Sequence, residues 1–395
     1  MNEQMGGNMK YHLSKEDSIW VKDSCSMLYK KMEAVCSRTG SMIPSVPENG
    51  RYRTDSGTRD ITDWVNGFWG GMMWQMYHAT GYPCFKNSAE NVEKRLDAAF
   101  EQFAGLHHDV GFMWLPTAVA DFKVTGNEHS RVRGIHAAAL LAGRYNPEAR
   151  FIRAWNPHIR GGRPEACTGW MIVDTLMNIP LLFWAAKQAE TPAFAYIAKN
   201  HADTAMKYIL RDDGTCNHIV VLDPENGEFL RVQEGQGYSL NSAWSRGQAW
   251  GIYGFALCAG YTGKAEYLSA AKKIANYFIA CTDKTGHISA CDFRAPMEPF
   301  LPDTSACACA ACGLLELAEQ LEDFEREFYV ESAVNILKAI AEKYANWDLD
   351  QDGVLNGGRG AYHSDEPREG RSLIFGDYFF VEALLRLNGK YLSIW

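Results

Sequence analysis

The residue best placed to do chemistry in this 395-residue sequence is Asp174, a carboxyl group inside the apolar stretch 170–184. A buried carboxylate is destabilising by several kcal/mol unless it is paired or protonated. As a helix, this stretch would place Trp170, Asp174 and Asn178 on one stripe, at i, i+4 and i+8. Indole, carboxyl and amide groups on one face are typical of a polar ligand pocket, whereas a satisfied core aspartate is the alternative.

Other clusters of polar and aromatic residues fall where further helices are expected to begin. They occupy residues 62–71, 107–116, 151–155, 235–238 and 243–250. In the last of them Arg246 and Trp250 share one helical face, and a guanidinium beside an indole suits a planar carboxylate on a ring. Each cluster alone could be core packing or capping, and Asp109 could simply cap its helix. Their co-occurrence favours a pocket.

The elements that must position these residues are predicted to be helices. Apolar residues recur at i, i+3, i+4 and i+7 over 91–103, 130–142, 193–210, 267–279 and 327–344. Strand-like alternation is confined to 217–222 and 229–232, around the turn at 223–227. We therefore expect an all-α protein with one short local β-hairpin and no larger sheet.

A weak repeat favours a closed arrangement of these helices. Gly81, Gly126 and Gly263 are each expected to end one helix shortly before the next begins. Recurrence at a few tens of residues, without a linker-like segment, indicates stacked helical hairpins. The periods are looser than in linear solenoids, so we predict an (α/α) toroid that forms a single domain over residues 1–395. In such a toroid the loops at one end of the inner helices build the pocket.

Composition narrows the classes of function. Hydrophobic residues make up 47% and charged residues 22% of the chain, as in an ordinary globular protein. Aromatic residues reach 12%, with Trp 12 and Tyr 18, more than a core needs, and flat rings are favoured platforms for sugars. The net charge of −9 argues against non-specific nucleic-acid binding. An anionic ligand would therefore need a local cation.

The cysteines and the N-terminus bear on location. The first ten residues contain no apolar core of a signal peptide, and no apolar stretch is long enough to span a bilayer. The 11 cysteines show no paired spacing. Cys307, Cys309 and Cys312 lack a second pair at zinc spacing, so they are better explained as small residues in helix packing. We expect a cytoplasmic protein that does not bind membranes.

Several of these motifs resemble the unsaturated glucuronyl hydrolases, glycoside hydrolase family 88. The resemblance covers the chain from about Trp64 onward, while residues 1–50 match only loosely, as a variable N-terminal segment would. The matching runs are DWVNGFW at 63–69, HHDVGF at 107–112, FIRAW at 151–155, Asp174 with NIPLL at 178–182, QGY at 236–238, WSRGQAWGIYG at 244–254, DTSACACAACGLLEL at 303–317 and GDYF at 376–379.

The resemblance implies an (α/α)6 barrel that removes the terminal 4,5-unsaturated uronic acid from oligosaccharides left by polysaccharide lyases. The C4=C5 bond of that sugar is a vinyl ether, so protonation of C4 places oxocarbenium-like charge at C5, where water adds. The hemiketal then opens and expels the aglycone. By the family pattern Asp174 is the general acid that also activates the water, and Asp109 is the second essential carboxylate. An apolar setting with a second carboxylate would raise the pKa of Asp174, as this chemistry needs.

The family pattern also implies a set of substrate-binding residues. They are Trp64, His108, Trp155, His218, Gln236, Arg246 and Trp250. Arg246 is the candidate for the uronate carboxylate, assisted by His218 or Gln236, and the tryptophans would wall or stack on the sugars. His108 corresponds to a residue that lines the family's site, although its neighbour His107 shows how easily a histidine can serve structure instead.

The segment 361–371 bears on the neighbouring sugar. Some relatives carry Ser and Lys after the histidine, a pattern suited to a sulfate, whereas Asp365 and Glu366 stand here and would repel one. We therefore expect unsulfated glycosaminoglycan-type disaccharides. Arg359, Arg368 or Arg371 would reverse this if one of them folds inward.

The proposed chemistry requires no metal and no cofactor. The run Asp348-Leu-Asp350-Gln-Asp352-Gly fits the start of a calcium loop, but Arg359 stands where the bidentate glutamate belongs. Three rival functions remain open: a conventional inverting glycosidase, which would use Asp109 and Asp174 with carboxyls roughly 6.5–9.5 Å apart, an unsaturated rhamnogalacturonyl hydrolase, and a sugar-binding protein without catalysis. Retention of both aspartates together with Arg246 speaks against the last.

Overall fold

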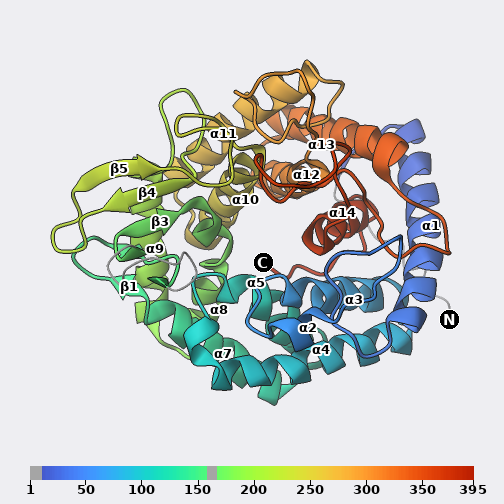
Figure 1. Ribbon diagram of the computed structural model, residues 1–395, viewed down its shortest axis with the longest axis horizontal. Helices are drawn as coiled ribbons and strands as arrows, with labels where there is room; N and C mark the ends of the chain where they lie inside the picture. The colour runs from blue at the N-terminus through green and yellow to red at the C-terminus, as the bar shows by residue number, and fades with distance from the viewer. Residues whose placement is uncertain (1–10, 158–166) are drawn as a thin grey trace.

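The computed structural model describes residues 11–157 and 167–395, most of which are helical. The helices form a closed ring with an inner and an outer layer (Figure 1). The inner helices are α3 (Asn66–Thr80), α5 (Val110–Trp114), α6 (Ala120–Thr125), α8 (Pro180–Gln188), α10 (Ser245–Thr262), α12 (Thr304–Ala318) and α14 (Ile374–Leu387). The outer helices are α1 (Lys15–Thr39), α4 (Pro83–Glu101), α7 (Glu128–Ala142), α9 (Pro192–Tyr208), α11 (Ala265–Asp283) and α13 (Asp323–Tyr344).

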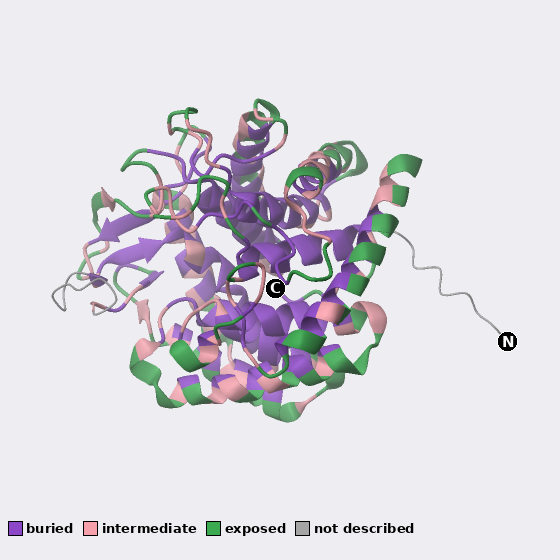
Figure 2. Cartoon of the chain, turned by 45° about the vertical axis from the view of Figure 1, so that its right-hand side comes forward, coloured by how far each residue is buried: buried purple, intermediate pink, exposed green. Residues whose placement is uncertain are grey.

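The burial pattern explains why each helix lies in its layer (Figure 2). Nearly every residue of α10, α12 and α14 is buried, because these helices are packed on all sides. An outer helix buries one stripe only. In α11 this stripe includes Tyr267, Ala271, Ile274 and Phe278, which are three or four residues apart. The five helices predicted from apolar periodicity coincide with α4, α7, α9, α11 and α13, so that prediction is confirmed.

The ring is closed by contacts between the ends of the chain. Helix α14 packs against α3 on the inside and α1 on the outside, while α10 contacts both α12 and the segment that carries Asp174. This closeness needs Gly254, because a Cβ there would lie 2.5 Å from Cβ of Leu176. The last residue, Trp395, lies in the centre of the ring (Figure 1), where its indole donates to Glu382 at 2.8 Å. The predicted toroid is confirmed.

The predicted glycine helix ends are also confirmed. Gly81, Gly126 and Gly263 have φ values of 73°, 74° and 69°, and each amide donates to the carbonyl four residues earlier. This left-handed conformation is one that glycine adopts without steric cost, so each helix ends where the next can begin.

A small sheet stands beside the ring. Strand β4 (Ile219–Leu222) pairs with β5 (Phe229–Gln233), which confirms the local hairpin. The expectation of no larger sheet was wrong, because β3 (Trp170–Ile172) adds to β4 on its other edge in antiparallel register. A further pair joins β1 (Tyr145–Asn146) to β2 (Phe151–Ile152).

The stretch 170–184 is not one helix, which corrects the first expectation. It comprises β3, a short 3-10 helix η5 (Val173–Met177) and then α8. Pro180 occupies the first turn of α8, where its missing N–H is harmless, whereas inside a continuous helix it would clash with the preceding turn. Trp170, Asp174 and Asn178 therefore do not share a helical stripe.

The acidic turn at 348–352 is occupied by cationic side chains rather than shaped for calcium. Lys31 Nζ donates to the carbonyls of Asp348 and Gln351 at 2.6 and 2.8 Å. Arg38 pairs with Asp352 at 2.7 Å. Arg38 thus takes a carboxylate that a Ca²⁺ site would use, and together with Lys31 it makes the turn an anchor for α1.

Two further observations concern the cysteines and the membrane. All 11 cysteines are free, and Cys307, Cys309 and Cys312 are buried in α12, as expected of small packing residues. Among the described residues, none of the helices combines the length and apolar character needed to cross a bilayer. The expectation of no leader in residues 1–10 falls outside the described part of the chain.

Candidate active site

A pocket of about 270 Å³ opens at one end of the ring. Its walls are Trp64, His107, Asp109, Trp155, Asp174, Gln236, Trp244 and Arg246. The pocket thus collects both predicted carboxyls and four of the predicted binding residues. Such a mixture of indole rings and a few convergent polar groups is typical of a small-ligand site.

Asp174 reaches the pocket from η5, directly after β3. The ladder between β3 and β4 continues one step beyond the strands, since the amide of Val173 donates to the carbonyl of His218 at 3.1 Å. Asp174 and His218 are therefore brought together by the sheet, with Oδ2 of Asp174 at 3.7 Å from Nε2 of His218. The Asp174 side chain keeps 17% of its surface exposed, which is enough to meet a ligand.

Asn178 joins the two carboxyl-bearing segments. Its Nδ2 donates to Asp109 Oδ1 at 2.9 Å and to the carbonyl of Asp174 at 3.0 Å. Its Oδ1 accepts the amide of Phe112 at 2.9 Å. Gly111 permits this approach, because a Cβ there would lie 2.5 Å from Cα of Asn178. One buried amide thereby sets the position of Asp109, just before α5, relative to Asp174.

The two carboxyls share a proton. Burial raises the pKa of Asp174 to about 6, against the opposing effect of Arg246. Burial, followed by the charge of Asp174, raises the pKa of Asp109 well above its usual value. Two buried carboxyls cannot both ionise near neutral pH without a large electrostatic penalty, so the pair holds one proton.

Hydrogen-bond donors decide which carboxyl holds it. Asp109 accepts from Asn178, and its Oδ2 lies 3.3 Å from Nε2 of His108. Oδ2 of Asp174 is buried and has no hydrogen-bond partner among the described residues. Donors stabilise an ionised carboxylate. Burial raises the pKa of Asp109 further than that of Asp174, but the donors oppose this, and on the hydrogen bonds we place the negative charge on Asp109 and the proton on Asp174.

A backbone amide sets the tautomer of His218. The N–H of Gln236 donates to Nδ1 of His218 at 3.0 Å, so the proton of the neutral ring resides on Nε2, which at 3.7 Å from Asp174 Oδ2 is too far for a hydrogen bond. The ring also packs on Trp244, with centroids 4.4 Å apart. His218 thus does not line the pocket as expected; it contacts Asp174 and Trp244, which do.

The two neighbouring histidines differ in position from what was expected. His107 lines the pocket, whereas His108 is buried beneath it, with Nδ1 at 2.6 Å from Thr175 Oγ1. Burial lowers the pKa of His108 well below its usual value, so the ring is neutral. His108 supports Asp109 from below and does not form the wall.

The donor atoms of His107, His108 and Asp109 lie within 4.8 Å of one another and form the one group among the described residues that could hold a metal ion. Its Asp109 oxygen lies 3.4 Å from His107 Nδ1. Nδ1 of His107 also faces the amide of Asp109 at 3.4 Å. Because that nitrogen accepts an N–H, it has no proton to donate to the carboxylate, and Asp109 takes its hydrogen bond from Asn178 instead.

Arg246 lines the pocket from the first turn of α10. Its Nη1 donates to Asp303 at 2.7 Å, and its Nη2 donates to the carbonyl of Gly360 at 2.6 Å. The guanidinium stacks on Trp244, 4.6 Å from the ring centroid. Its Nε–H makes no hydrogen bond with any described residue and is available for a ligand carboxylate. Asp303 therefore fixes the cation that the sequence predicted.

Trp250 does not reach the pocket. It is fully buried and packs on Phe112 and Phe379 with centroids 5.2 and 5.5 Å apart. Trp244, just before α10, forms the wall instead. The motif at 244–250 contained both tryptophans. Trp244 reaches the pocket because it lies before α10, whereas Trp250 lies within the helix and faces the core, and sequence spacing does not show this difference.

These features define a sugar-processing hydrolase of the α/α-barrel class: a ring of helical hairpins with two coupled carboxyls in a tryptophan-walled pocket. Comparison with known proteins identifies the family. Residues 38–365 match the model of Glycosyl Hydrolase Family 88. The chain belongs to this family and is a glycoside hydrolase.

Individual relatives agree with this assignment. The chain is 39% identical over 346 residues to unsaturated glucuronyl hydrolase of Bacillus sp. strain GL1, covering 85% of this chain and 89% of the relative. It is 33% identical over 342 residues to unsaturated chondroitin disaccharide hydrolase of Streptococcus pneumoniae, with 85% and 84% covered.

Solved structures agree as well. The structure of unsaturated glucuronyl hydrolase from Streptococcus agalactiae matches with a TM-score of 0.86 at 29% identity, covering 100% of this chain and 98% of that one. A variant of that hydrolase complexed with dGlcA-GalNAc6S matches with a TM-score of 0.78 at 29% identity, with 96% and 94% covered.

Proposed function

We propose that the protein releases the terminal 4,5-unsaturated uronic acid from glycosaminoglycan-type oligosaccharides by adding water across the C4=C5 bond. The observation that carries this proposal is the asymmetry of the carboxyl pair. Asp174 has a buried oxygen without a donor and a raised pKa, whereas Asp109 is held by Asn178. A proton donor to carbon near neutral pH needs such an acid. The substrates named for the family relatives support the same assignment.

The reaction then runs through Asp174. Its proton passes to C4, and the positive charge that develops is shared by C5 and the ring oxygen. The Asp174 carboxylate next takes a proton from the water whose oxygen adds to C5. The hemiketal opens by breaking the bond between C5 and the ring oxygen, and the hemiacetal left at C1 releases the aglycone. Ionised Asp109 stabilises the developing positive charge and accepts hydrogen bonds from ring hydroxyls.

The substrate carboxylate is assigned to Arg246. Asp303 and the loop carbonyls hold the guanidinium still, so little side-chain entropy is lost on binding. Trp64 and Trp155 are proposed to enclose the sugar from the opposite wall. Gln236 acts mainly by holding the pocket's rim, because its Nε2 donates to the carbonyl of Gly360 at 2.8 Å.

The rim loop gives weaker support for unsulfated substrates than expected. Glu366 is turned inward: its carboxylate accepts from the amide of Gly360 and from Ser364 at 2.7 and 2.8 Å and pairs with Arg371 at 2.7 Å. Glu366 therefore organises the loop rather than repelling a ligand.

Arg359 is buried, but its guanidinium donates to the carbonyls of Pro367 and Arg368, and none of Arg359, Arg368 and Arg371 lines the pocket. Exposed Asp365 keeps the repelling role, and we propose a preference for unsulfated disaccharides on its charge alone.

The test is the loss of ultraviolet absorbance of the C4=C5–carboxylate when the protein is mixed with lyase-generated disaccharides. We expect loss with unsulfated chondroitin or hyaluronan disaccharides. Asp174→Asn should lower kcat by about 10³-fold or more, since a general acid contributes roughly 10²–10⁴-fold. Asp223→Asn, in the β4–β5 turn, is the control and should keep full activity. Full activity of Asp174→Asn would refute the mechanism, and loss only with rhamnogalacturonan products would reassign the substrate.

We also propose that the protein works in the cytoplasm. The support is its cysteine chemistry: all 11 thiols are free, and most are buried among apolar side chains. Cell fractionation, with blotting for the native protein, tests this location.

A further inference from the structure

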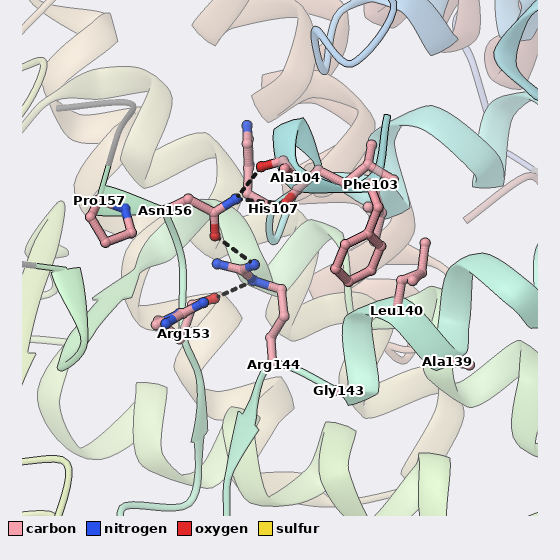
Figure 3. Close-up of a pocket in the computed structure, with 12 residues that line it drawn as sticks. Phe103, Ala104, His107, Ala139, Leu140, Gly143, Arg144, Arg153, Asn156 and Pro157 are labelled. Atoms are coloured by element: carbon pink, nitrogen blue, oxygen red, sulfur yellow. Dashed lines mark hydrogen bonds between the residues drawn. The ribbon is translucent and has the colours of Figure 1, made fainter. Parts of the chain in front are cut away.

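A second and larger cavity adjoins the catalytic pocket. It measures about 540 Å³, twice the 270 Å³ of the pocket that holds the carboxyls. It lies between the end of α7, the short helix η1 (Phe103–Gly105) and the segment 153–157 (Figure 3). His107 lines both cavities, so they meet at this residue. No step of the proposed reaction uses the larger cavity.

One wall of this cavity is cationic. Arg144 donates to Asn156 Oδ1 at 2.9 Å and to the carbonyl of Arg153 at 2.8 Å, as Figure 3 shows. Burial and then the charge of Arg153 lower the pKa of Arg144 to about 9. The described lining includes no carboxylate. The Arg153 guanidinium makes no hydrogen bond or ion pair with the described residues. Arg144 also feels the charge of Asp109, which lies outside this lining, whereas Arg153 has no carboxylate beside it among the lining residues, so this wall favours an anion at Arg153.

The opposite wall is apolar. It consists of Phe103, Leu106, Val110, Ala139 and Leu140. A sugar ring presents its C–H face to such a wall and its hydroxyl and carboxylate groups to the polar one. The volume lies within the range of about 300–1,000 Å³ common for ligand pockets. A free inorganic anion would leave the apolar wall unused.

The partition between the two cavities is firmly held. Trp155 faces the catalytic pocket, whereas Arg153 and Asn156 of the same segment line the larger cavity. Nδ2 of Asn156 donates to the carbonyls of Ala104 and Leu106 at 3.1 and 2.8 Å. The two cavities are thus separated by a fixed segment and border on each other at His107.

We propose that the larger cavity is a second uronate subsite, with Arg153 as the carboxylate-binding residue. The inference rests on the proposed function, because its ligand is an acidic sugar. In an unsulfated glycosaminoglycan the uronates alternate with amino sugars, so the third sugar of an unsaturated tetrasaccharide carries the next carboxylate. The same chemistry is offered by the free sugar acid that the reaction produces.

The experiment compares unsaturated disaccharides and tetrasaccharides of unsulfated chondroitin. Arg153→Gln should raise KM for the tetrasaccharide about tenfold and leave KM for the disaccharide unchanged, since a hydrogen bond to a charged group contributes roughly 1.5–3 kcal/mol. Ala139→Trp fills the cavity from an exposed position and should act in the same way. Arg150→Gln, three residues from Arg153 and outside the lining, is the matched control and should affect neither substrate.

The sources of the ligand are separated by adding free glucuronate to the disaccharide reaction. Inhibition that Arg153→Gln relieves, with no tetrasaccharide effect, would assign the subsite to the free acid. The proposal would be overturned if neither Arg153→Gln nor Ala139→Trp changes KM for either substrate and calorimetry detects no glucuronate binding. If the unaltered protein consumes neither substrate, the proposed function fails, while glucuronate titration of Arg153→Gln against the unaltered protein still tests the subsite.

Discussion

Asn178 Nδ2 lies 2.9 Å from Asp109 Oδ1, and the same nitrogen holds the carbonyl of Asp174. A single side chain thereby controls both the separation of the two carboxyls and the place of their shared proton. The sequence singles out Asn178 but does not predict this role, because the amide acts on Asp109, a residue distant in the sequence.

Replacing Asn178 should move the proton. In Asn178→Ala, Asp109 loses a donor and its pKa rises further, so the proton shifts away from Asp174. We expect kcat to fall by about 10–100-fold, with little change in KM and a displaced pH profile, because a lost hydrogen bond to a charge is worth roughly 1.5–3 kcal/mol. Asn66→Ala removes a buried amide that donates to the carbonyl of Asp60 at 2.8 Å and is the control. It should lower stability and leave the pH profile in place; an equal shift in both variants would contradict the role of Asn178.

The rate should depend on a carboxyl that titrates near pH 6. Asp174 must be protonated to act as the acid, and burial raises its pKa to about 6. We therefore expect kcat/KM to fall about tenfold per pH unit above roughly pH 6. Initial rates in the absorbance assay between pH 5 and 8.5 measure this. A rate that rises through this interval would show that the ionised form of Asp174 is the active one.

The same group should make the fold less stable as the pH rises. Its pKa is raised in the folded state, so its stabilising contribution is complete below about pH 4, the range of an unfolded aspartate, and is lost as the pH rises through about 6. Between pH 4 and 8 the unaltered protein should lose about 2.5 kcal/mol more than Asp174→Asn does, since a rise from 3.8 to about 6 at 1.36 kcal/mol per pKa unit gives about 3 kcal/mol over the whole titration. Urea unfolding at both pH values gives the difference. Parallel pH dependence of the two proteins would exclude it.

Arg246 should be needed for folding as well as for binding. Its ion pair with Asp303 has both side chains almost fully buried, at 2% and 0% exposed. Removing one partner of a buried pair typically costs 3–5 kcal/mol, so Arg246→Ala should unfold at clearly lower urea concentration. Asp303→Asn keeps the shape but releases the cation, and it should raise KM. Unchanged stability of Arg246→Ala would mean that Asp303 finds another partner.

Chelators should change neither activity nor stability. The turn at 348–352 already has Lys31 and Arg38 on its oxygens, and the proposed reaction moves only protons. Melting curves with EDTA and with added Ca²⁺ should superimpose. Lys31→Met, in contrast, leaves two carbonyls without their donor and should lower the melting temperature in both solutions.

Local pattern predicted most of the ring but not the segment at its centre. Outer helices such as α11 carry their burial stripe in their own sequence, so periodicity reveals them. The strand β3 exists because β4, almost fifty residues later, pairs with it, and no local pattern encodes such pairing. Pro180 was the local signal against one continuous helix. Likewise, the choice of His107 over His108, or of Trp244 over Trp250, depends on where each residue lies in the packed ring.

The strand β3 has a consequence for how the proton donor is placed. Asp174 follows β3 and His218 precedes β4, so the alignment of these two strands sets the distance between the acid and the imidazole. A strand pair can shift only by whole residues, and a shift by one would turn the side chains to the opposite face. The distance between Asp174 and His218 therefore cannot be adjusted by small shifts of one strand along the other. The register of β3 and β4 thus fixes the separation of Asp174 and His218.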